Sequence, residues 1–205
     1  DLESYGKPLI FVDSNTLYLG HSCVTTDLED SVITALEHFL EHHHKKIGLL
    51  VGQEETADAT PLQMDPRQRV FQQFLTEKGL YEERFVAVGQ FSTESGYQMM
   101  EQLIQALGDD LPTAFFMASD AIAVGALRSL QEHQIAVPDR VSLISFNDTS
   151  IAKYVFPALS TVTVYTEEMG KQAIQMLRQT FQGSQPSVPC MVKLATKLTI
   201  RDSSR

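Results

Sequence analysis

The segment TAFFMASDAIAVGALRSLQEHQIAVPDRVSLISFND (residues 113–148) is typical of a strand, a helix and a second strand. Residues 114–118 form an apolar run that is too short for a helix and rich enough in aromatics for a buried strand. Apolar side chains then recur at helical spacing from Ile122 onward. A Val-Pro-Asp sequence separates this helix from a second apolar run at residues 141–146. Two strands joined in this way are expected to lie parallel, through a right-handed crossover.

Polar side chains follow each of these two strands. Ser119 and Asp120 come after the first, and Asn147 and Asp148 after the second. Ligands of open parallel sheets bind beyond the carboxyl ends of the strands, so these residues are candidate ligand contacts. Two structural roles compete with that interpretation. Asp120 is placed to act as the N-cap of the helix, and Asn147 and Asp148 are residues that turns favour.

The composition excludes several classes of protein. The chain of 205 residues has a formal net charge of -10 and a pI near 5.0. Polyanion binding is led by positive charge, so the chain alone is a poor binder of nucleic acid or anionic membranes. Two cysteines without CxxC spacing predict neither a disulfide framework nor a zinc site, and favour a reducing cytoplasmic location. No apolar run approaches membrane-spanning length.

Strands and helices alternate regularly from residue 47 to residue 146. This alternation predicts an α/β lobe, doubly wound, with helices on both faces of a parallel sheet. The first strands, from residue 8, and a last helix, from Thr166, lie outside the block. The helix pattern places Ile174 and Phe181 among its inward side chains. We expect these outer elements to form a second lobe that the chain visits twice.

Other strand ends supply three further candidate contacts. Asp13 ends the first strand, Arg69 lies near the start of the helix after the strand at residues 47–51, and Phe91 follows a strand at residues 85–88. Carboxylates, amides and a guanidinium take paired hydroxyls bidentately, and an aromatic ring packs against sugar C–H groups. A small polyhydroxylated ligand therefore suits this set. The competing roles are a surface salt bridge for Arg69 and a core position for Phe91.

The sequence gives no support for catalysis, a cofactor or a metal. It contains no GxGxxG, GxxxxGK[ST] or GxSxG motif. His42, His43 and His44 are adjacent and cannot all face one metal ion from a helix. A solvated helix end, where cations are favourable to the dipole, is the better interpretation of that run. We therefore predict that the chain is not an enzyme.

Two segments resemble the lactose-repressor/galactose-repressor (LacI/GalR) family of bacterial transcription regulators. They are FFMASDAIAVGALRSLQEHQIAVPDRVSLISFND (residues 115–148) and LSTVTVYTEEMGKQAIQML (residues 159–177). The resemblance implies a type I periplasmic-binding-protein-like fold, α/β, with doubly wound parallel sheets in two lobes joined by three crossovers. The family's DNA-binding headpiece and the first β-α units of its N-terminal lobe have no counterpart in this sequence. We thus expect an incomplete N-terminal lobe.

The resemblance also divides the chain and assigns roles. Residues 1–24 and 163–192 would be the remnant of the N-terminal lobe, and residues 25–162 and 193–205 the C-terminal lobe. The resemblance implies that Asp13 stands for the family's sugar-contacting aspartate, Arg69 for its effector-binding arginine and Phe91 for the aromatic that stacks on the sugar. Two further positions differ from the family: Ser119 stands where many members have asparagine, and Asn147 where most have aspartate. The last two departures leave the identity of the sugar open.

The implied function is sugar-responsive repression in the cytoplasm, for instance of a galactose or galactoside utilisation operon. The implied partners are a sugar effector, operator DNA through the headpiece, and a second copy of the chain. The dimer face would use the helix after Ser92, the helix at residues 121–129 and the segment 151–157. A sugar would act by shifting the populations of lobe arrangements.

The alternative is the sugar-binding protein of a transporter, which shares the fold. A helix-turn-helix or a signal peptide upstream would separate the two.

Overall fold

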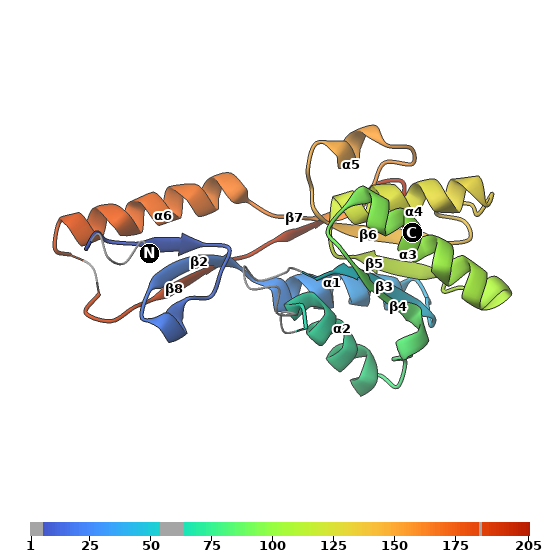
Figure 1. Cartoon of the computed structure of the whole chain (residues 1–205), viewed down its shortest axis with the longest axis horizontal. Coiled ribbons are helices and arrows are strands. Elements are labelled where there is room, and N and C mark those ends of the chain that lie inside the picture. Colours follow the sequence, from blue (N-terminus) through green and yellow to red (C-terminus); the bar gives the residue numbers. More distant parts are fainter. Residues whose placement is uncertain (1–5, 54–63, 185) are drawn as a thin grey trace. The chain divides into compact units, whose positions relative to one another are not determined.

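The computed structural model describes residues 6–53, 64–184 and 186–205. The chain forms two compact units (Figure 1). Unit 1 comprises Asp1–Asp27 and Val164–Thr196, and unit 2 comprises Leu28–Thr163 and Lys197–Arg205. The chain therefore passes between the units three times. The predicted lobes ended at residues 24, 162 and 192, whereas the observed units end at Asp27, Thr163 and Thr196.

Unit 2 is built on a six-stranded sheet in the order β4-β3-β5-β6-β7-β9. Its strands are β3 (Ile47–Gly52), β4 (Val86–Gly89), β5 (Ala114–Met117), β6 (Ser142–Asn147), β7 (Ser160–Thr163) and β9 (Lys197–Thr199). All neighbours are parallel except β9, which runs antiparallel to β7. The strand order reverses between β3 and β5, and in sheets of this order the ligand crevice lies at that switch point.

Helices cover both faces of this sheet, as the alternation of elements predicts. They are α1 (Leu28–Glu41), α2 (Pro66–Glu77), α3 (Thr93–Leu107), α4 (Asp120–Glu132) and the short α5 (Ile151–Tyr154). Two 3-10 turns, η3 (Glu83–Phe85) and η4 (Gly108–Asp110), precede β4 and β5. α1 packs against α2 and α3 against α4, and the two pairs lie on opposite faces of the sheet (Figure 1).

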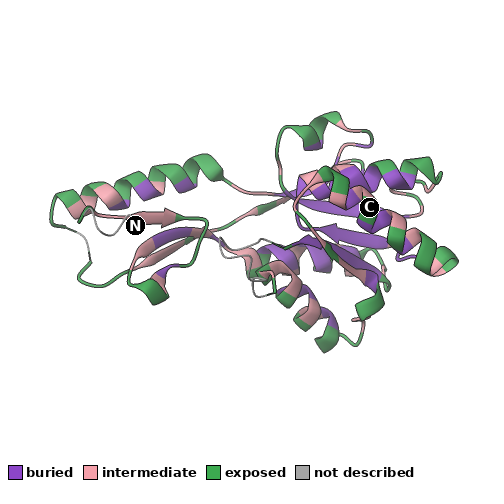
Figure 2. Cartoon of the chain, viewed as in Figure 1, coloured by how far each residue is buried: buried purple, intermediate pink, exposed green. Residues whose placement is uncertain are grey.

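The core of unit 2 follows the alternation of side chains along its strands. All of β3 and β5 is buried, as are the first five residues of β6 (Figure 2). Leu50, Phe115 and Leu143 face α3 and α4 and join one apolar cluster with them. Burial on both faces explains why these strands are continuous apolar runs in the sequence.

α3 and α4 approach each other closely at two glycines. A β-carbon on Gly125 would lie 1.9 Å from the carbonyl oxygen of Thr93, and one on Gly96 would lie 2.2 Å from that of Ile122. Any larger residue would force the helices apart, because the clashing atoms belong to backbone. This contact fixes the start of α4 beside the start of α3.

Unit 1 contains a parallel sheet in the order β1-β2-β8, with α6 packed on it. The elements are β1 (Ile10–Val12), η2 (Leu17–Leu19), β2 (Ser22–Thr26), α6 (Thr166–Phe181) and β8 (Met191–Leu194). The buried stripe of α6 is formed by Met169, Ala173 and Met176.

The prediction that Ile174 and Phe181 face inward is wrong, since these side chains are 59% and 70% exposed. Ile174 lies five residues after Met169, about 140° around the helix. None of the helices in the described part of the chain has the length and apolarity needed to cross a membrane.

Candidate functional site

Polar and aromatic residues follow the parallel strands of unit 2 at one edge of the sheet. Phe91 lies just after β4, and Ser119 just after β5. Asn147 is the last residue of β6 and is exposed, and Asp148 follows it. These predicted contacts therefore all follow the carboxyl ends of β4, β5 and β6, the edge at which ligands of open parallel sheets bind.

Arg67 is a cation at this edge, and its position follows from how α2 begins. Asp65 is the N-cap, and its carboxylate accepts from the backbone N–H of Arg67 at 2.8 Å. Pro66 suits the first helical position, where no backbone donor is needed. The same carboxylate accepts from Arg67 Nε at 2.9 Å and from Nη2 at 2.7 Å. Arg67 Nη1 donates to the carbonyl oxygen of Ala118 at 2.7 Å, which ties α2 to the end of β5.

Two aromatic rings flank the Arg67 guanidinium. Its central carbon lies 4.8 Å from the ring centroid of Phe91 and 5.4 Å from that of Phe146. Both separations are within the range in which a cation is attracted by the ring face. Phe91 also lies against Gly52, where a β-carbon would come within 2.4 Å of its ring. A glycine at the end of β3 is thus required to seat Phe91.

The predicted arginine, Arg69, is not brought to this edge. It is exposed on α2, where its backbone N–H bonds to Asp65. Residues two apart on a helix point about 200° away from each other, so Arg67 and Arg69 cannot share one environment. The signal that identifies Arg67 is the Asp-Pro pair at residues 65–66, which fixes where the helix begins.

Arg67 keeps donors for a ligand despite its protein partners. An arginine carries five N–H donors, and three of them bond to Asp65 and Ala118. One N–H on each terminal nitrogen has no hydrogen bond within the described part of the chain. Such a pair of donors suits two neighbouring oxygens of one ligand.

Ser119, not Asp120, is the N-cap of α4. The Ser119 hydroxyl accepts from the backbone N–H of Ile122 at 3.3 Å, and Asp120 is the first helical residue. The prediction of Asp120 as the cap is therefore wrong. A serine cap was available in the sequence one residue earlier, and Ser and Asp are comparable in that role.

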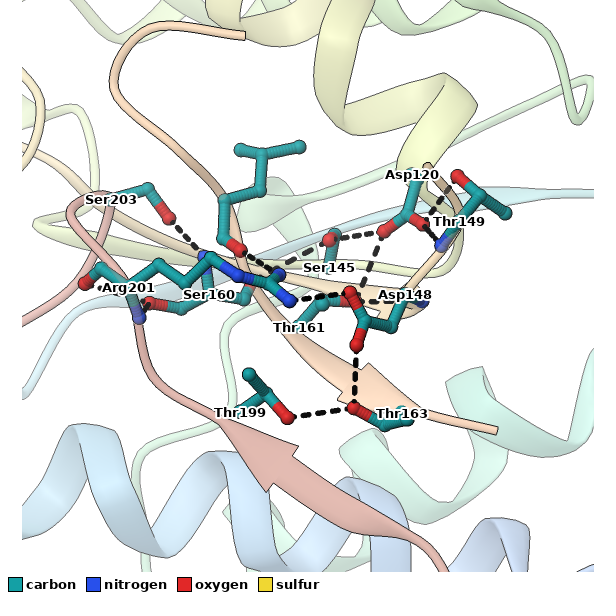
Figure 3. A network of polar contacts seen from close by, with 11 residues as sticks. Asp120, Ser145, Asp148, Thr149, Ser160, Thr161, Thr163, Thr199, Arg201 and Ser203 are labelled. Atoms are coloured by element: carbon teal, nitrogen blue, oxygen red, sulfur yellow. Dashed lines mark hydrogen bonds and ion pairs between the residues drawn. The ribbon is translucent and has the colours of Figure 1, made fainter. Parts of the chain in front are cut away.

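Asp120 has a buried structural role. It is 1% exposed, and its carboxylate accepts from Ser145 Oγ at 2.5 Å and from Thr161 Oγ1 at 3.0 Å. It also accepts from the backbone N–H of Thr149 at 2.6 Å and from Thr149 Oγ1 at 2.8 Å (Figure 3). Both carboxylate oxygens are thus bonded to protein donors, which joins α4, β6, β7 and the segment before α5.

Asp148 is likewise held by the protein. Its Oδ1 accepts from Arg201 Nη2 at 2.7 Å, and its Oδ2 accepts from Thr163 Oγ1 at 2.9 Å (Figure 3). No local pattern in the sequence points to Arg201. The ion pair joins residues 53 positions apart, and only the antiparallel placement of β9 beside β7 brings them together.

Asp13 belongs to unit 1. It follows β1, its backbone N–H donates to Val24 at 2.9 Å, and it has a positive φ of 63°. A sugar-contacting role for Asp13 therefore stays a prediction. Within the described residues, no three His, Cys, Asp or Glu side chains are grouped as metal ligands.

These features define a periplasmic binding protein-like domain, and the family of that description matches residues 36–204. The chain is 50% identical over 204 residues to the HTH-type transcriptional regulator GalR of Streptococcus thermophilus, covering 100% of this chain and 61% of the relative. It is 36% identical over 203 residues to GalR of Lacticaseibacillus casei, covering 99% and 61%. The chain therefore belongs to the periplasmic binding protein-like domain family. Over its whole length it is similar to these GalR regulators, of whose length it spans about three fifths.

Solved structures share this fold. The chain superposes on the transcriptional regulator CelR in its cellobiose complex with a TM-score of 0.85 and 25% identity, covering 98% of this chain and 60% of that one. The lac repressor dimer bound to operator and the anti-inducer ONPF has the same fold, with a TM-score of 0.82 and 24% identity, covering 96% and 56%. The predicted fold class is confirmed.

Proposed function

We propose that the chain is the effector-binding and dimerisation part of a sugar-responsive LacI/GalR-type repressor of a sugar-utilisation operon. Galactose or a galactoside is the first candidate effector, because the GalR relatives align with essentially the whole chain. The single observation that carries the proposal is the Arg67–Phe91 pair at the switch point of the sheet. A forked donor beside a partly exposed ring matches the hydroxyl pairs and apolar C–H faces of a sugar.

The charges at the edge favour an uncharged sugar over a sugar phosphate. Within the described part of unit 2, the two guanidinium groups near the edge are already paired, Arg67 with Asp65 and Arg201 with Asp148. A phosphate would therefore find no guanidinium there that lacks a carboxylate partner. Hydroxyls can bind to Arg67, to the exposed Asn147 and to Ser119, while Asp13 remains a proposed contact from unit 1.

The proposed mechanism is allosteric. A sugar that binds one arrangement of the lobes more tightly shifts the population toward it, by no more than its differential affinity. In the intact regulator this shift alters the affinity for operator DNA through a headpiece outside the present sequence. The transporter alternative is not favoured, because the curated relatives are named as transcriptional regulators. Cytoplasmic location and the lack of a catalytic role belong to the same proposal.

A second copy of the chain is the proposed partner of the surface formed by α3, α4 and α5. On α5 and just after it, Tyr154 and Phe156 are 83% and 85% exposed. Gln131 of α4 donates to the Phe156 carbonyl oxygen at 2.6 Å, which fixes that segment to α4. Large exposed aromatics on an ordered surface are typical of an interface.

The test uses the full-length protein and an operator selected from random DNA. Fluorescence anisotropy would measure operator affinity with and without D-galactose, lactose and cellobiose. We expect at least one sugar to change the dissociation constant about five-fold or more, the lower end of typical coupling. An operator affinity that no bound sugar changes would contradict the proposal.

A further inference from the structure

The backbone at the end of β6 is strained at two consecutive residues. Asn147 has a φ of 107° and Asp148 a φ of 55°, and neither residue is glycine. Left-handed conformations of this kind cost on the order of 1–3 kcal/mol each and persist only where the surroundings enforce them. Asn147 is the exposed end residue of β6 at the ligand edge.

Asp148 fastens the second strained residue to β7. Its backbone N–H donates to Thr161 Oγ1 at 3.3 Å, and its carboxylate accepts from Thr163 Oγ1 at 2.9 Å. The remaining carboxylate oxygen pairs with Arg201 Nη2 at 2.7 Å. The side chains of Arg201 and Asp148 are 16% and 9% exposed, so water screens this ion pair weakly.

Arg201 is itself held in place by β7 and the residue before it. Its Nη1 donates to the carbonyl oxygen of Leu159 at 2.8 Å, and its backbone N–H donates to Ser160 Oγ at 2.8 Å. The Arg201 guanidinium therefore links the carbonyl oxygen of Leu159, just before β7, to the carboxylate of Asp148 (Figure 3). On the other side of the turn, Asp120 binds the backbone and side chain of Thr149.

The same contacts reach two of the places where the chain passes between the units. Thr163, which donates to Asp148, is the last residue of unit 2 before the chain enters unit 1. The Thr163 hydroxyl also lies 2.7 Å from that of Thr199, on β9, just after the chain returns at Lys197.

We propose that Arg201 and Asp148 are positioning residues. Their ion pair holds Asn147 in the conformation that presents its side chain to the sugar, and Thr163 and Thr199 join that pair to two of the places where the chain passes between the units. The proposal rests on the proposed function, because it takes this edge as the sugar site. It removes Asp148 from the direct contacts and adds Arg201 as support for the site.

The test compares Arg201→Gln with Arg205→Gln in the full-length protein. Arg205 pairs with Asp139 on the surface, where their side chains are 71% and 65% exposed, so it loses the same charge from the same segment. Hydrogen–deuterium exchange would be followed at residues 147–150 and, as an internal reference, at β5. We expect Arg201→Gln to speed exchange at 147–150 by about ten-fold or more with β5 unchanged, and Arg205→Gln to alter neither.

Sugar binding provides the second readout, with D-galactose, lactose and cellobiose as probes. For the sugar that binds the wild type, we expect Arg201→Gln to lower the affinity about ten-fold and Arg205→Gln to leave the affinity unchanged. If Arg201→Gln does not fold, Thr163→Val decides, since it exchanges only the hydroxyl for a methyl group and should speed exchange at 147–150 to a smaller extent. Exchange at 147–150 that stays at the wild-type rate would overturn the proposal. If no sugar binds the wild type, the proposed function fails, while the exchange result still decides whether Arg201 positions the turn.

Discussion

The ring of Phe91 occupies the space that a side chain on Gly52 would fill. A β-carbon there would lie 2.4 Å from the ring and 2.7 Å from the backbone nitrogen of Phe91. β3 and β4 are neighbouring strands, and Gly52 pairs with Gly89 at their ends. The absence of a side chain at one strand end therefore sets the position of the aromatic ring at the next.

Gly52→Ala should displace Phe91 and weaken sugar binding. We expect a loss of about 1–3 kcal/mol in the free energy of unfolding, as for other overpacked sites, together with about a ten-fold loss of sugar affinity. Urea unfolding and isothermal titration calorimetry would measure the two effects.

Gly170→Ala on α6 is the matched control, since a β-carbon there meets nothing within 4 Å. The control should stabilise the protein by about 0.4–1 kcal/mol. Wild-type sugar affinity in Gly52→Ala would contradict this account of how Phe91 is seated.

Uncharged sugars should bind more tightly than their phosphates. The guanidinium groups of Arg67 and Arg201 are paired with carboxylates. A phosphate therefore finds no unpaired guanidinium among the described residues of this edge, and its charge gains little there to offset its desolvation, a cost that an unmodified hexose does not have. Calorimetry should show D-galactose binding at least about ten-fold more tightly than galactose 6-phosphate, and the reverse order would contradict the charge argument.

Asp120→Asn should destabilise unit 2. All the groups that bond to the Asp120 carboxylate are donors, and a carboxamide offers one acceptor oxygen and turns a second donor toward them. Leaving such buried groups unsatisfied costs about 2–4 kcal/mol in the free energy of unfolding. Urea unfolding would measure the loss, with Asp139→Asn on the surface as the control. Equal stability of the two variants would show that the buried network is dispensable.

Acidification should destabilise the fold through two histidines. Burial, reinforced by positive charge on His42, holds the pKa of His38 and His44 below the ordinary value of 6.5. The unfolded chain therefore takes up protons first as the pH falls below about 6.5, so stability present above that pH is lost as the pH falls through the lowered values. His38 Nε2 is also buried without a hydrogen-bond partner in the described part of the chain.

Urea unfolding at about pH 8 and pH 5.5 would measure this effect. The wild type should lose more stability than the double variant His38→Gln/His44→Gln, and the exposed His43→Gln should behave as the wild type does. Identical pH dependence of the wild type and the double variant would assign the acid sensitivity to other groups.

The sheet of unit 2 was predictable because its strands are buried on both faces. Residues 114–118 and 141–146 are continuous apolar runs between polar residues, and only a strand covered by helices on both sides accommodates them. Ser119, Asn147 and Phe91 lie at the ends of predicted strands, so the sequence alone places them at the carboxyl edge of the sheet.

The sequence does not reveal which face of a helix is turned toward the sheet, or which distant residues come into contact. Arg67 and Arg69 differ by two residues, and only the cap at Asp65 decides which of them faces the sheet. The apolar pattern of α6 predicts a core position for Ile174, but the pattern does not show which face of the helix meets the sheet, and the side chain is 59% exposed. The Asp148–Arg201 pair spans 53 positions and follows no periodic pattern.

The central claim is that the edge around Arg67 binds the sugar, and calorimetry on two single variants of the full-length protein tests it most directly. Arg67→Ala and Arg69→Ala remove the same charge from the first turn of the same helix, but only Arg67 lies between Phe91 and Ala118. We predict that Arg67→Ala lowers the affinity for the sugar at least about 100-fold, as expected when a charged hydrogen-bonding group is lost. Arg69→Ala should bind the sugar as tightly as the wild type does. Unchanged binding in Arg67→Ala, or a loss confined to Arg69→Ala, would contradict the account.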